Sequence, residues 1–450
     1  GGATVARYVW TVTSGGVSTE TETETPSFTV KNPAGGVCTV SLKAYDGSGN
    51  LVGSAERSVT VKPRDVFVSL DGGNVFPYAR PQDAARTVAD AVAAVYCEES
   101  RPGRVYVAPG KYPETPNVAM LLNPIELIGD ENPERVVLRF KSSTTQSGIT
   151  VNHPMALVHG VTLTGSATGS GDEDYKHGGA FHIAQGVVSN CVVTGFNTLN
   201  FRSMSAVAIE TGGTFTDSTV SNNSNSSTAY ARGVLGVYMA GGTIERTVIA
   251  NNKFNGDRAA VGAFWMADGT ARDLFITNNS VKGQSSGEGI TVGARVAGGT
   301  FERCVVADNV NGDSANGDSV GGLAVTGAAV VRNVLVRGNV VNSTAAGSVG
   351  GLLVNAAGAD VRHVTVTGNS AVSAPGGLLL RNGTVRGSIS SGNVGSADSA
   401  ISGGTISYSC YPSATGADTT KPANFHAGTS SNTTRETSSR PQQPRNSTRE

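Results

Sequence analysis

The line "GTFERCVVADN", residues 299–309, is one copy of a pattern that recurs nine times between residues 156 and 393. Each copy is followed by a second apolar line such as "GGLAVTG" or "GGLLVNA". Two or three short strands per period, with Gly or Asn at each corner, are typical of a parallel β-solenoid in which one coil stacks on the next. The copies end 24 to 30 residues apart, at Ser166, Phe196, Asn223, Asn252, Asn279, Asn309, Asn339, Asn369 and Asn393.

The composition excludes most other architectures. The 59 Gly residues of this 450-residue chain are incompatible with helical repeats, and the Leu framework of leucine-rich repeats is absent. No apolar run is long enough to span a bilayer. Because 34 Lys and Arg balance 35 Asp and Glu, the net charge of -1 gives no reason to expect nucleic acid as a partner. Five scattered cysteines without a CxxC predict neither a disulfide framework nor a zinc site.

Two columns of the repeat are expected to point inward and to stack like on like, because coils lie about 4.8 Å apart. The eighth residue before the end of each line is Val188, Phe215, Ile244, Ala271, Phe301, Val331, Val361 or Val385. The third before the end is Val193, Val220, Ile249, Ile276, Val306, Val336, Val366 or Ser390. Cys191 and Cys304 are expected as buried free thiols. The terminal Asn column predicts an Asn ladder at a corner, with these Asn in left-handed geometry.

The rest of the chain divides into three further parts. Residues 1–63 alternate in strand fashion around the turn "DGSGN" and predict a small β-sandwich. Residues 64–104 predict a linker and one amphipathic cap helix, which begins at Pro81 and carries apolar residues at helical spacing. The solenoid covers residues 105–415. Residues 416–450 are rich in Thr, Ser and Arg and predict a disordered tail.

These segments resemble two known families. Residues 1–63 resemble part of a PKD-type immunoglobulin-like domain, which implies extracellular display and no catalysis. The strand-rich repeats, with "VYVAPGKY" at residues 105–112 as a first coil, resemble the right-handed parallel β-helix of the pectin-lyase-like superfamily. They also look like repeats of large secreted or surface proteins of bacteria. The catalytic motif sets of pectin methylesterases, polygalacturonases and pectate lyases are missing from this sequence.

The densest polar cluster lies in the loop "GDEDYKHGG". Its carboxylates beside a Lys and a His could act as acid and base or bind Ca²⁺, and the alternative is a solvated loop. These candidate catalytic residues are Asp172, Glu173, Asp174, Lys176 and His177. A weaker candidate Ca²⁺ site follows in "DNVNGDSANGDS", although two Asn-Gly turns explain that segment equally well. Its residues are Asp308, Asp313 and Asp318.

A third feature is the column seven residues before the end of each line, which is polar and therefore expected outside. It runs His159, Ser189, Thr216, Glu245, Arg272, Glu302, Arg332, Arg362 and Arg386. Its last three members are Arg on consecutive coils, and Asp360 is the one acidic residue between 328 and 393. Such a positive stripe could bind acidic glycan, whereas solvated Arg stems covering the sheet are the alternative. The candidate binding residues are Arg332, Arg337, Arg362, His363, Arg381 and Arg386.

The sequence therefore predicts an all-β protein, secreted or displayed on a cell surface, whose signal and anchor lie outside this fragment. We expect a non-catalytic monomer that acts in adhesion or binds acidic polysaccharide or cell-surface glycan, with no cofactor other than Ca²⁺. The alternative is a polysaccharide lyase or glycoside hydrolase that acts on an acidic polysaccharide such as pectin.

Overall fold

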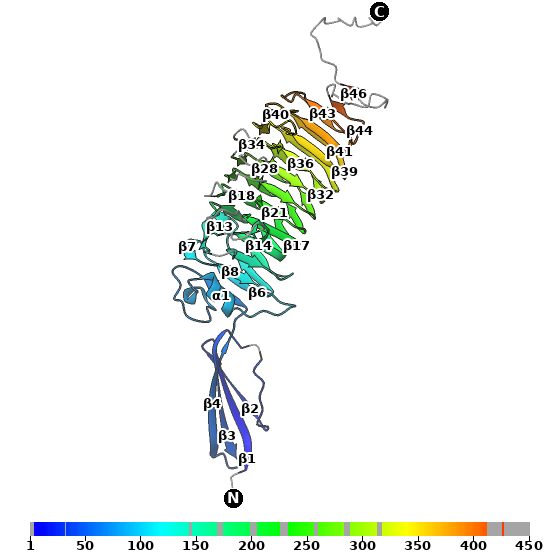
Figure 1. Ribbon diagram of the computed structural model, residues 1–450. Coiled ribbons are helices and arrows are strands. Elements are labelled where there is room, and N and C mark those ends of the chain that lie inside the picture. The colour runs from blue at the N-terminus through cyan, green and yellow to red at the C-terminus, as the bar shows by residue number, and fades with distance from the viewer. Residues whose placement is uncertain are drawn as a thin grey trace, which may run out of the picture.

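The computed structural model describes residues 4–31, 33–143, 146–168, 174–198, 205–225, 233–255, 260–282, 289–312, 317–411 and 425–426. These residues form a long parallel β-solenoid with a small antiparallel sheet at its N-terminal end (Figure 1). One sheet of 38 strands winds through the whole solenoid. The β-helix architecture predicted from the repeats is therefore confirmed, and its right-handed winding stays a prediction.

The N-terminal sheet has the strand order β2-β1-β3-β4. Its antiparallel strands are β1 (Val5–Ser14), β2 (Val17–Thr23), β3 (Gly36–Asp46) and β4 (Leu51–Val61). The predicted sandwich needs a second sheet, but the described residues before 64 form only this one. Phe28, from the segment between β2 and β3, stacks on Trp10 with 5.9 Å between ring centroids, so irregular chain packs on the face where a second sheet would lie. The PKD-type identity stays a prediction.

The solenoid has three main faces, which we call faces A, B and C in chain order within a coil. Face A contains β5 (Asp65–Val68), β6 (Gly103–Val107), β9 (Ile125–Ile128), β12 (Leu157–His159), β22 (Thr243–Glu245), β27 (Thr270–Arg272), β32 (Gly299–Glu302) and β44 (Thr405–Ser407). Parts of five longer strands complete it, namely β14 (Phe181–Ser189), β17 (Val207–Thr216), β37 (Ala329–Arg337), β39 (Leu352–Thr367) and β41 (Leu378–Arg386).

Face B follows directly after a corner residue. It contains β7 (Gly110–Thr115), β10 (Val136–Lys141), β13 (Thr162–Ala167), β15 (Val192–Thr194), β18 (Thr219–Ser221), β23 (Val248–Ala250), β28 (Phe275–Thr277), β33 (Val305–Ala307), β42 (Ile389–Ser391), β45 (Cys410–Tyr411), β46 (Phe425–His426) and parts of β37 and β39. Beyond the next corner lie short strands, namely β16 (Asn197–Thr198), β19 (Ser224–Asn225), β24 (Lys253–Phe254), β29 (Ser280–Val281), β34 (Val310–Asn311), β38 (Val340–Val341) and β40 (Ser370–Ala371).

Face C closes each coil. It contains β8 (Ala119–Leu121), β11 (Ile149–Val151), β21 (Val237–Met239), β26 (Phe264–Met266), β31 (Ala294–Val296), β36 (Leu323–Val325), β43 (Ser399–Ile401) and the first parts of β14, β17, β39 and β41. A separate parallel sheet precedes it in the middle coils, formed by β20 (Gly233–Val234), β25 (Ala260–Val261), β30 (Ile290–Thr291) and β35 (Ser319–Val320).

The predicted core columns are confirmed. Every residue of both columns is buried, with Phe301 and Val306 at 0% exposure. Stacked aromatic pairs, such as Phe264 and Phe301 at 6.1 Å, continue the column packing between faces. Burial also raises the pKa of the Cys191 and Cys304 thiols to about 12, so both are neutral packing groups, as expected.

The Asn ladder is confirmed, and it is buried. In each step the side-chain Nδ2 donates to Oδ1 of the next Asn at 2.8–2.9 Å, and the backbone N–H of the same residue donates to that Oδ1 as well. The ladder ends where Asn393 donates to Asp398. Its members are Asn223, Asn252, Asn279, Asn309, Asn339, Asn369 and Asn393.

The expected left-handed geometry of the ladder Asn was wrong by one residue. Positive φ belongs to the residue before each ladder Asn, such as Asn278 (54°) or Asp308 (57°). The reason is that the chain must turn before the ladder side chain can point inward and reach the coil below it.

The cap helix also differs from the expectation. Pro81 begins a short 3-10 helix, η1 (Pro81–Asp83), and the α-helix α1 (Val88–Ala94) starts separately. Thr87 caps α1, because its side chain accepts a hydrogen bond from the backbone N–H of Asp90. Two further 3-10 helices are η2 (Pro133–Arg135) and η3 (Asp174–His177). No helix in the described part of the chain is long and apolar enough to cross a membrane.

Strand pairing shows that the solenoid extends beyond both predicted boundaries of its segment. β5, within the predicted linker, already pairs with β6. β46, within the predicted disordered tail, pairs with β45. The remaining residues of that tail lie outside the described residues.

We predict that Asn309→Ala lowers the free energy of unfolding by about 2–4 kcal/mol. It removes the buried Oδ1 that accepts from the backbone N–H and Nδ2 of Asn279, and the Nδ2 that donates to Asn339 Oδ1. Urea denaturation measures the change. The matched control is Asn278→Gly, which removes an exposed corner amide and keeps the positive φ, so it should change stability by less than about 0.5 kcal/mol. Equal effects of the two substitutions would contradict the ladder's role.

Candidate functional site

The predicted polar column is present as one continuous row on the outside of face A. Strand pairing aligns its members coil by coil, from His159 with Ser189 through Glu302 with Arg332 to Arg362 with Arg386. The residue after each member occupies the corner between faces A and B with positive φ, for example Arg303 at 52°. We call these corner residues the corner column; they are Asn190, Asp217, Arg246, Asp273, Arg303, Asn333, His363, Gly387 and Tyr408.

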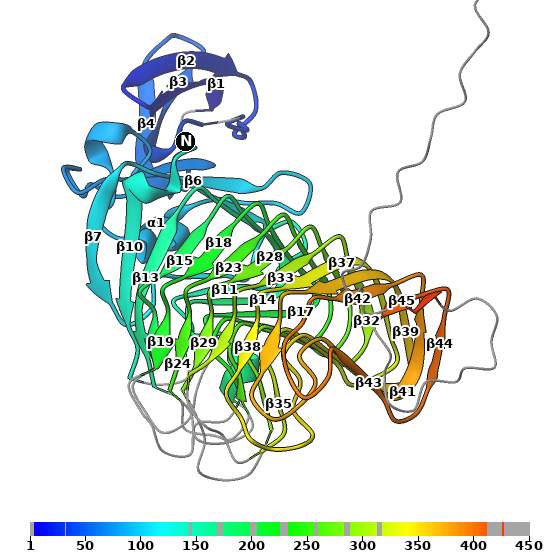
Figure 2. The same ribbon diagram turned by 90° about the horizontal axis from the view of Figure 1, so that it is seen from above.

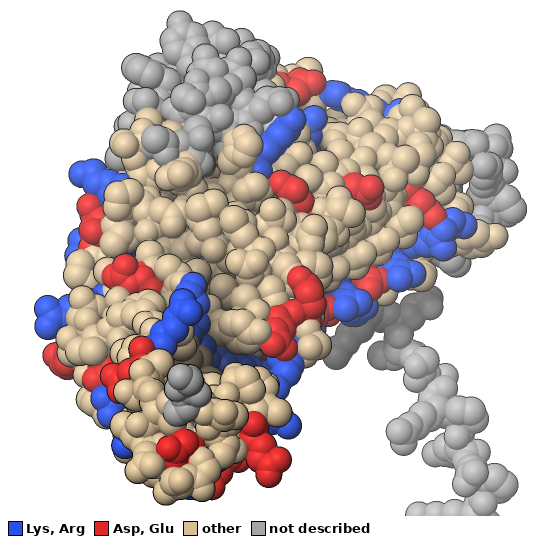
Figure 3. Space-filling view, turned by 90° about the horizontal axis from the view of Figure 1, so that it is seen from below, with Lys and Arg blue, Asp and Glu red and all other residues tan. Residues whose placement is uncertain are grey.

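Charges alternate in both columns through the middle coils. The face A column contains, on successive coils, Glu245, Arg272, Glu302 and Arg332. The corner column beside it contains Asp217, Arg246, Asp273 and Arg303. Figure 3 shows acidic and basic side chains alternating along one edge of the solenoid. Arg303 bonds Asp273 at 2.8 Å and Glu302 at 2.8 Å, and Arg332 bonds Glu302 at 2.6 Å. The expectation that Glu302 faces solvent was wrong: it is 8% exposed because two guanidinium groups neutralise it.

The Arg side chains of the positive stripe expected after residue 330 are all paired with carboxylates. Asp360 is one partner, and the others come from outside residues 328–393. Arg332 pairs with Glu302, Arg337 with Asp308 at 3.5 Å and Arg381 with Asp318 at 3.3 Å. Arg362 and Arg386 share Asp360, the latter at 3.2 Å. His363 lies in the corner column beside Arg362. A ligand at this stripe would compete with an ion pair at each Arg.

The candidate Ca²⁺ residues are not brought together as a site. Asp308 and Asp318 bind Arg337 and Arg381, and Asp313 lies outside the described residues. In the described ranges there is no group of three His, Cys, Asp or Glu that could hold a metal ion.

The acidic loop leads to the outside of face C. Asp172 and Glu173 lie outside the described residues, and only the backbone of Asp174 is described, within η3. η3 lies against β17 and β21. The ring of His177 meets that of His182 edge to face, with 6.1 Å between centroids. Lys176 lies beside His177 in η3 and has interactions of its own. The structure therefore places this end of the loop over face C.

A His–Glu pair that we did not predict lies at this place. His182 Nε2 and Glu210 Oε1 are 2.6 Å apart, with side-chain exposures of 21% and 49%. His182 is on β14 and Glu210 directly follows the first part of β17, one coil further along. The two residues are 28 positions apart in the sequence, which is one repeat period. An alignment of each coil with the next would therefore have placed them close together.

An aromatic and cationic row continues from this pair on the outside of face C. Strand register aligns His182, Ala208, Tyr238, Trp265 and Arg295 on successive coils. Tyr238 meets Trp265 edge to face at 5.6 Å, and the Arg295 guanidinium lies 5.0 Å from the Trp265 ring centroid. Arg295 also donates to Thr326. We call Tyr238, Trp265 and Arg295 the aromatic row.

Small residues lie beside the aromatic row. Ala240 and Gly241 follow β21, Ala267 follows β26, and Ala297 and Gly298 follow β31. Two carboxylates, Glu210 and the exposed Asp268, flank this low strip. Their Cα atoms are two coils apart, which corresponds to roughly 10 Å. Trp265 and Arg295 are partly exposed, whereas Tyr238 is only 7% exposed and packs against Ala208, Val234 and Val261. The accessible part of this surface therefore combines a Trp ring, a guanidinium and the two carboxylates.

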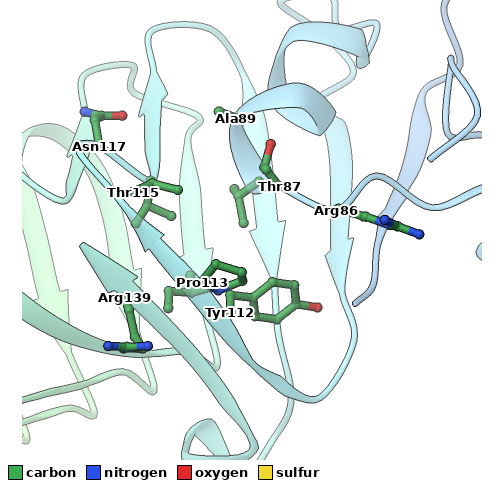
Figure 4. Close-up of a pocket in the computed structure, with 11 residues that line it drawn as sticks. Arg86, Thr87, Ala89, Tyr112, Pro113, Thr115, Asn117 and Arg139 are labelled. Atoms are coloured by element: carbon green, nitrogen blue, oxygen red, sulfur yellow. The ribbon is translucent and has the colours of Figure 1, made fainter. Parts of the chain in front are cut away.

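Hollows between the described residues differ widely in size. One of about 580 Å³, open to solvent, is lined by Lys62, Arg64 and Glu98 among others. The pocket beneath α1 is lined by Thr87, Tyr112 and Arg139 among others (Figure 4). Its volume of about 40 Å³ holds only a few water molecules, whereas typical ligand pockets measure about 300–1,000 Å³. The Tyr112 hydroxyl near this pocket already donates to the carbonyl of Ala108 at 2.8 Å.

Comparisons with solved structures find distant matches. A tailspike protein mutant of E. coli bacteriophage HK620, in complex with a pentasaccharide, matches with 15% identity and a TM-score of 0.37 over 81% of this chain and 78% of that one. The family 28 exopolygalacturonase of Yersinia enterocolitica matches with 11% identity and a TM-score of 0.26 over 93% and 92%. No family model and no curated protein matches the sequence.

We predict that Glu302→Gln lowers the free energy of unfolding by about 1–2 kcal/mol at pH 7, because it removes the charge that two Arg share. Hydrogen bonding to Arg332 lowers the pKa of Glu302 from 4.5. A lowered folded-state pKa means that the carboxylate stabilises the protein at neutral pH and ceases to do so as the pH falls through that value.

The difference between Glu302→Gln and the unmodified protein should therefore shrink below pH 4.5. Denaturation at pH 7 and at acid pH measures it. Glu134→Gln, at an exposed position, is the control and should change little at either pH. A difference that stays constant with pH would contradict the account.

Proposed function

We propose that this protein binds polysaccharide on the outside of face C and does not cleave it. The observation that supports the proposal is the alignment of the aromatic row with the His182–Glu210 pair on successive coils. Tyr and Trp rings present apolar faces together with polar edges, and a few convergent polar groups fix the orientation of a ligand. A linear polymer could lie along the solenoid axis and contact one coil after another.

The ligand class that we propose is an acidic polysaccharide. Arg295 presents N–H donors beside Trp265, and guanidinium groups bind carboxylate and sulfate with paired hydrogen bonds. Lys176 and His177 approach the same surface from η3. Secretion or display at the cell surface belongs to the same proposal, since extracellular polymers would be met there.

The Arg stripe remains the second location for the same ligand. We rank it below face C because every described Arg of the stripe already bonds a carboxylate, so an acidic glycan would have to displace it. Face C adds the Trp265 ring beside Arg295, and the candidate residues of the stripe include no such ring. The Arg332, Arg362 and Arg386 column lies on face A and the aromatic row on face C, so substitutions in these two rows separate the locations.

A second candidate function is hydrolysis of the polysaccharide, alternatively its cleavage by elimination. Glu210 and Asp268 lie two coils apart on this surface, and most glycosidases use a pair of carboxyl groups as acid and base or nucleophile. Incubation with polygalacturonate, alginate and sulfated glycans, with and without Ca²⁺, tests both functions at once. New reducing or unsaturated ends that disappear in Glu210→Gln would replace the binding proposal with this one.

We predict that Trp265→Ala and Arg295→Ala each weaken retention on the bound glycan by about tenfold or more, since each removes a central contact. Affinity electrophoresis in gels that contain the glycan measures this. Arg362→Ala, on the stripe, is the matched control and should change retention by less than about twofold. Loss of retention in the control alone would move the site to the Arg stripe, and no retention of any acidic glycan would overturn the ligand class.

A further inference from the structure

Face B carries a partly exposed stripe of six apolar residues and two Thr along the solenoid. Strand register aligns the middle residue of its outer surface on eight coils, which we call the face B stripe. Phe275 and Ile389 are 40% and 47% exposed. Figure 2 shows β15, β18, β23, β28 and β33 side by side along this face. The stripe consists of Val192, Thr219, Val248, Phe275, Val305, Leu335, Thr365 and Ile389.

The stripe is a continuous line of residues along the solenoid and not a set of isolated apolar residues. Seven steps of about 4.8 Å make it roughly 34 Å long, and three residues of strand with the flanking corner make it roughly 15 Å wide. This corresponds to roughly 500 Å² per copy, or about 1,000 Å² in a complex of two, which is the lower end of specific interfaces. This area includes the charged corner column as well as the apolar residues. The largest apolar patches on monomers measure about 300–600 Å² and are often functional.

The order of residues along the stripe is nearly the same when read backwards. A two-fold axis that crosses the stripe between Phe275 and Val305 would place Phe275 on Val305 of a second copy and Val248 on Leu335. Further out it would place Thr219 on Thr365 and Val192 on Ile389. Apolar residues thus meet apolar residues, and Thr meets Thr, in an antiparallel pair of solenoids.

The charges of the corner column, which borders the stripe, obey the same symmetry. The same axis places Asp273 on the partner's Arg303 and Arg303 on the partner's Asp273. It places Arg246 on Asn333 and Asp217 on His363, so no two like charges meet. The side chains of Arg303 and Asp273 are 47% and 36% exposed and already bond each other within one chain at 2.8 Å. Two copies would join these pairs into a cluster of four alternating charges.

The opposite border of face B is compatible with the same arrangement. The second outward column has Ala250, Thr277 and Ala307 in the central coils, all of them small. Its one exposed charge, Arg337, would lie over Ala250 and keeps its own pair with Asp308. An isologous two-fold contact requires a self-complementary surface of this kind.

We propose that two copies of this chain associate through their face B stripes, antiparallel, about a two-fold axis between Phe275 and Val305. This replaces the expectation of a monomer. The small area gives a weak dimer, with dissociation in the micromolar range. The dimer leaves face C accessible in both copies, so it is independent of the proposed glycan site.

A charge-exchange experiment on the full chain tests the pairing. Asp273→Arg gives a copy with two Arg at the axis, and Arg303→Asp gives a copy with two Asp there. Sedimentation velocity should show each variant alone to dimerise about tenfold or more weakly than the unmodified protein, because like charges meet. An equimolar mixture should dimerise to within about threefold of the unmodified protein, since opposite charges then meet across the axis.

Rescue by mixing identifies contacts between copies, because an ion pair within one chain cannot be restored by a second chain. The matched control exchanges another ion pair of the corner column, with the variants Arg246→Asp and Asp217→Arg. In the proposed dimer Arg246 and Asp217 lie opposite the partner's Asn333 and His363. Mixing these two variants should therefore not restore dimerisation. Circular dichroism melting confirms that each variant is folded. Phe275→Asp, with Leu122→Asp at an exposed position off the stripe as its control, tests the apolar contact separately.

Three results would overturn the proposal. The unmodified protein could remain monomeric at about 200 µM, well above the expected dissociation constant. The mixture of Asp273→Arg and Arg303→Asp could stay as dissociated as its components. Phe275→Asp could dimerise as strongly as Leu122→Asp.

Discussion

The parallel pairing of each coil with the next is the constraint on which the rest of the structure depends. Because coils repeat every 24 to 30 residues and lie about 4.8 Å apart, each side chain meets the residue at the same place in the neighbouring coil. Apolar residues then build a continuous core at little cost. A charged residue cannot simply repeat, because like charges at this distance repel.

The molecule meets that constraint in a different way at each polar column. Asn repeats in the ladder because an amide is both donor and acceptor, so Asn309 donates to Asn339 and accepts from Asn279. Carboxylates and guanidinium groups alternate instead, as Glu302 between Arg272 and Arg332 shows. Where Arg repeats, at Arg362 and Arg386, Asp360 is placed between them from a neighbouring column.

The sequence predicted the parts of the fold that depend on one column at a time. Phe301, Val306 and Asn309 were placed correctly because each repeats its own chemistry every coil. Glu302 was placed on the correct side of face A, but its burial was not predicted, because that burial depends on Arg303 beside it and Arg332 a coil away. His182 and Glu210 were missed for the same reason. The single helix expected from Pro81 onward was split, because local spacing did not reveal that Thr87 caps a separate helix.

Function is expected on surfaces where the outward columns are not needed to hold the coils together. The described residues include two such surfaces. Face C has rings and charges that change from coil to coil, which suits a ligand that is recognised at several points. Face B has a stripe with a two-fold pattern, which suits a second copy. The most direct test of the central claim is hydrogen–deuterium exchange of the full chain with and without an acidic oligosaccharide. Binding on face C should slow exchange at residues 205–212, 237–241, 264–268 and 294–298. Slowed exchange confined to residues 330–337 and 360–367, or none at all, would contradict it.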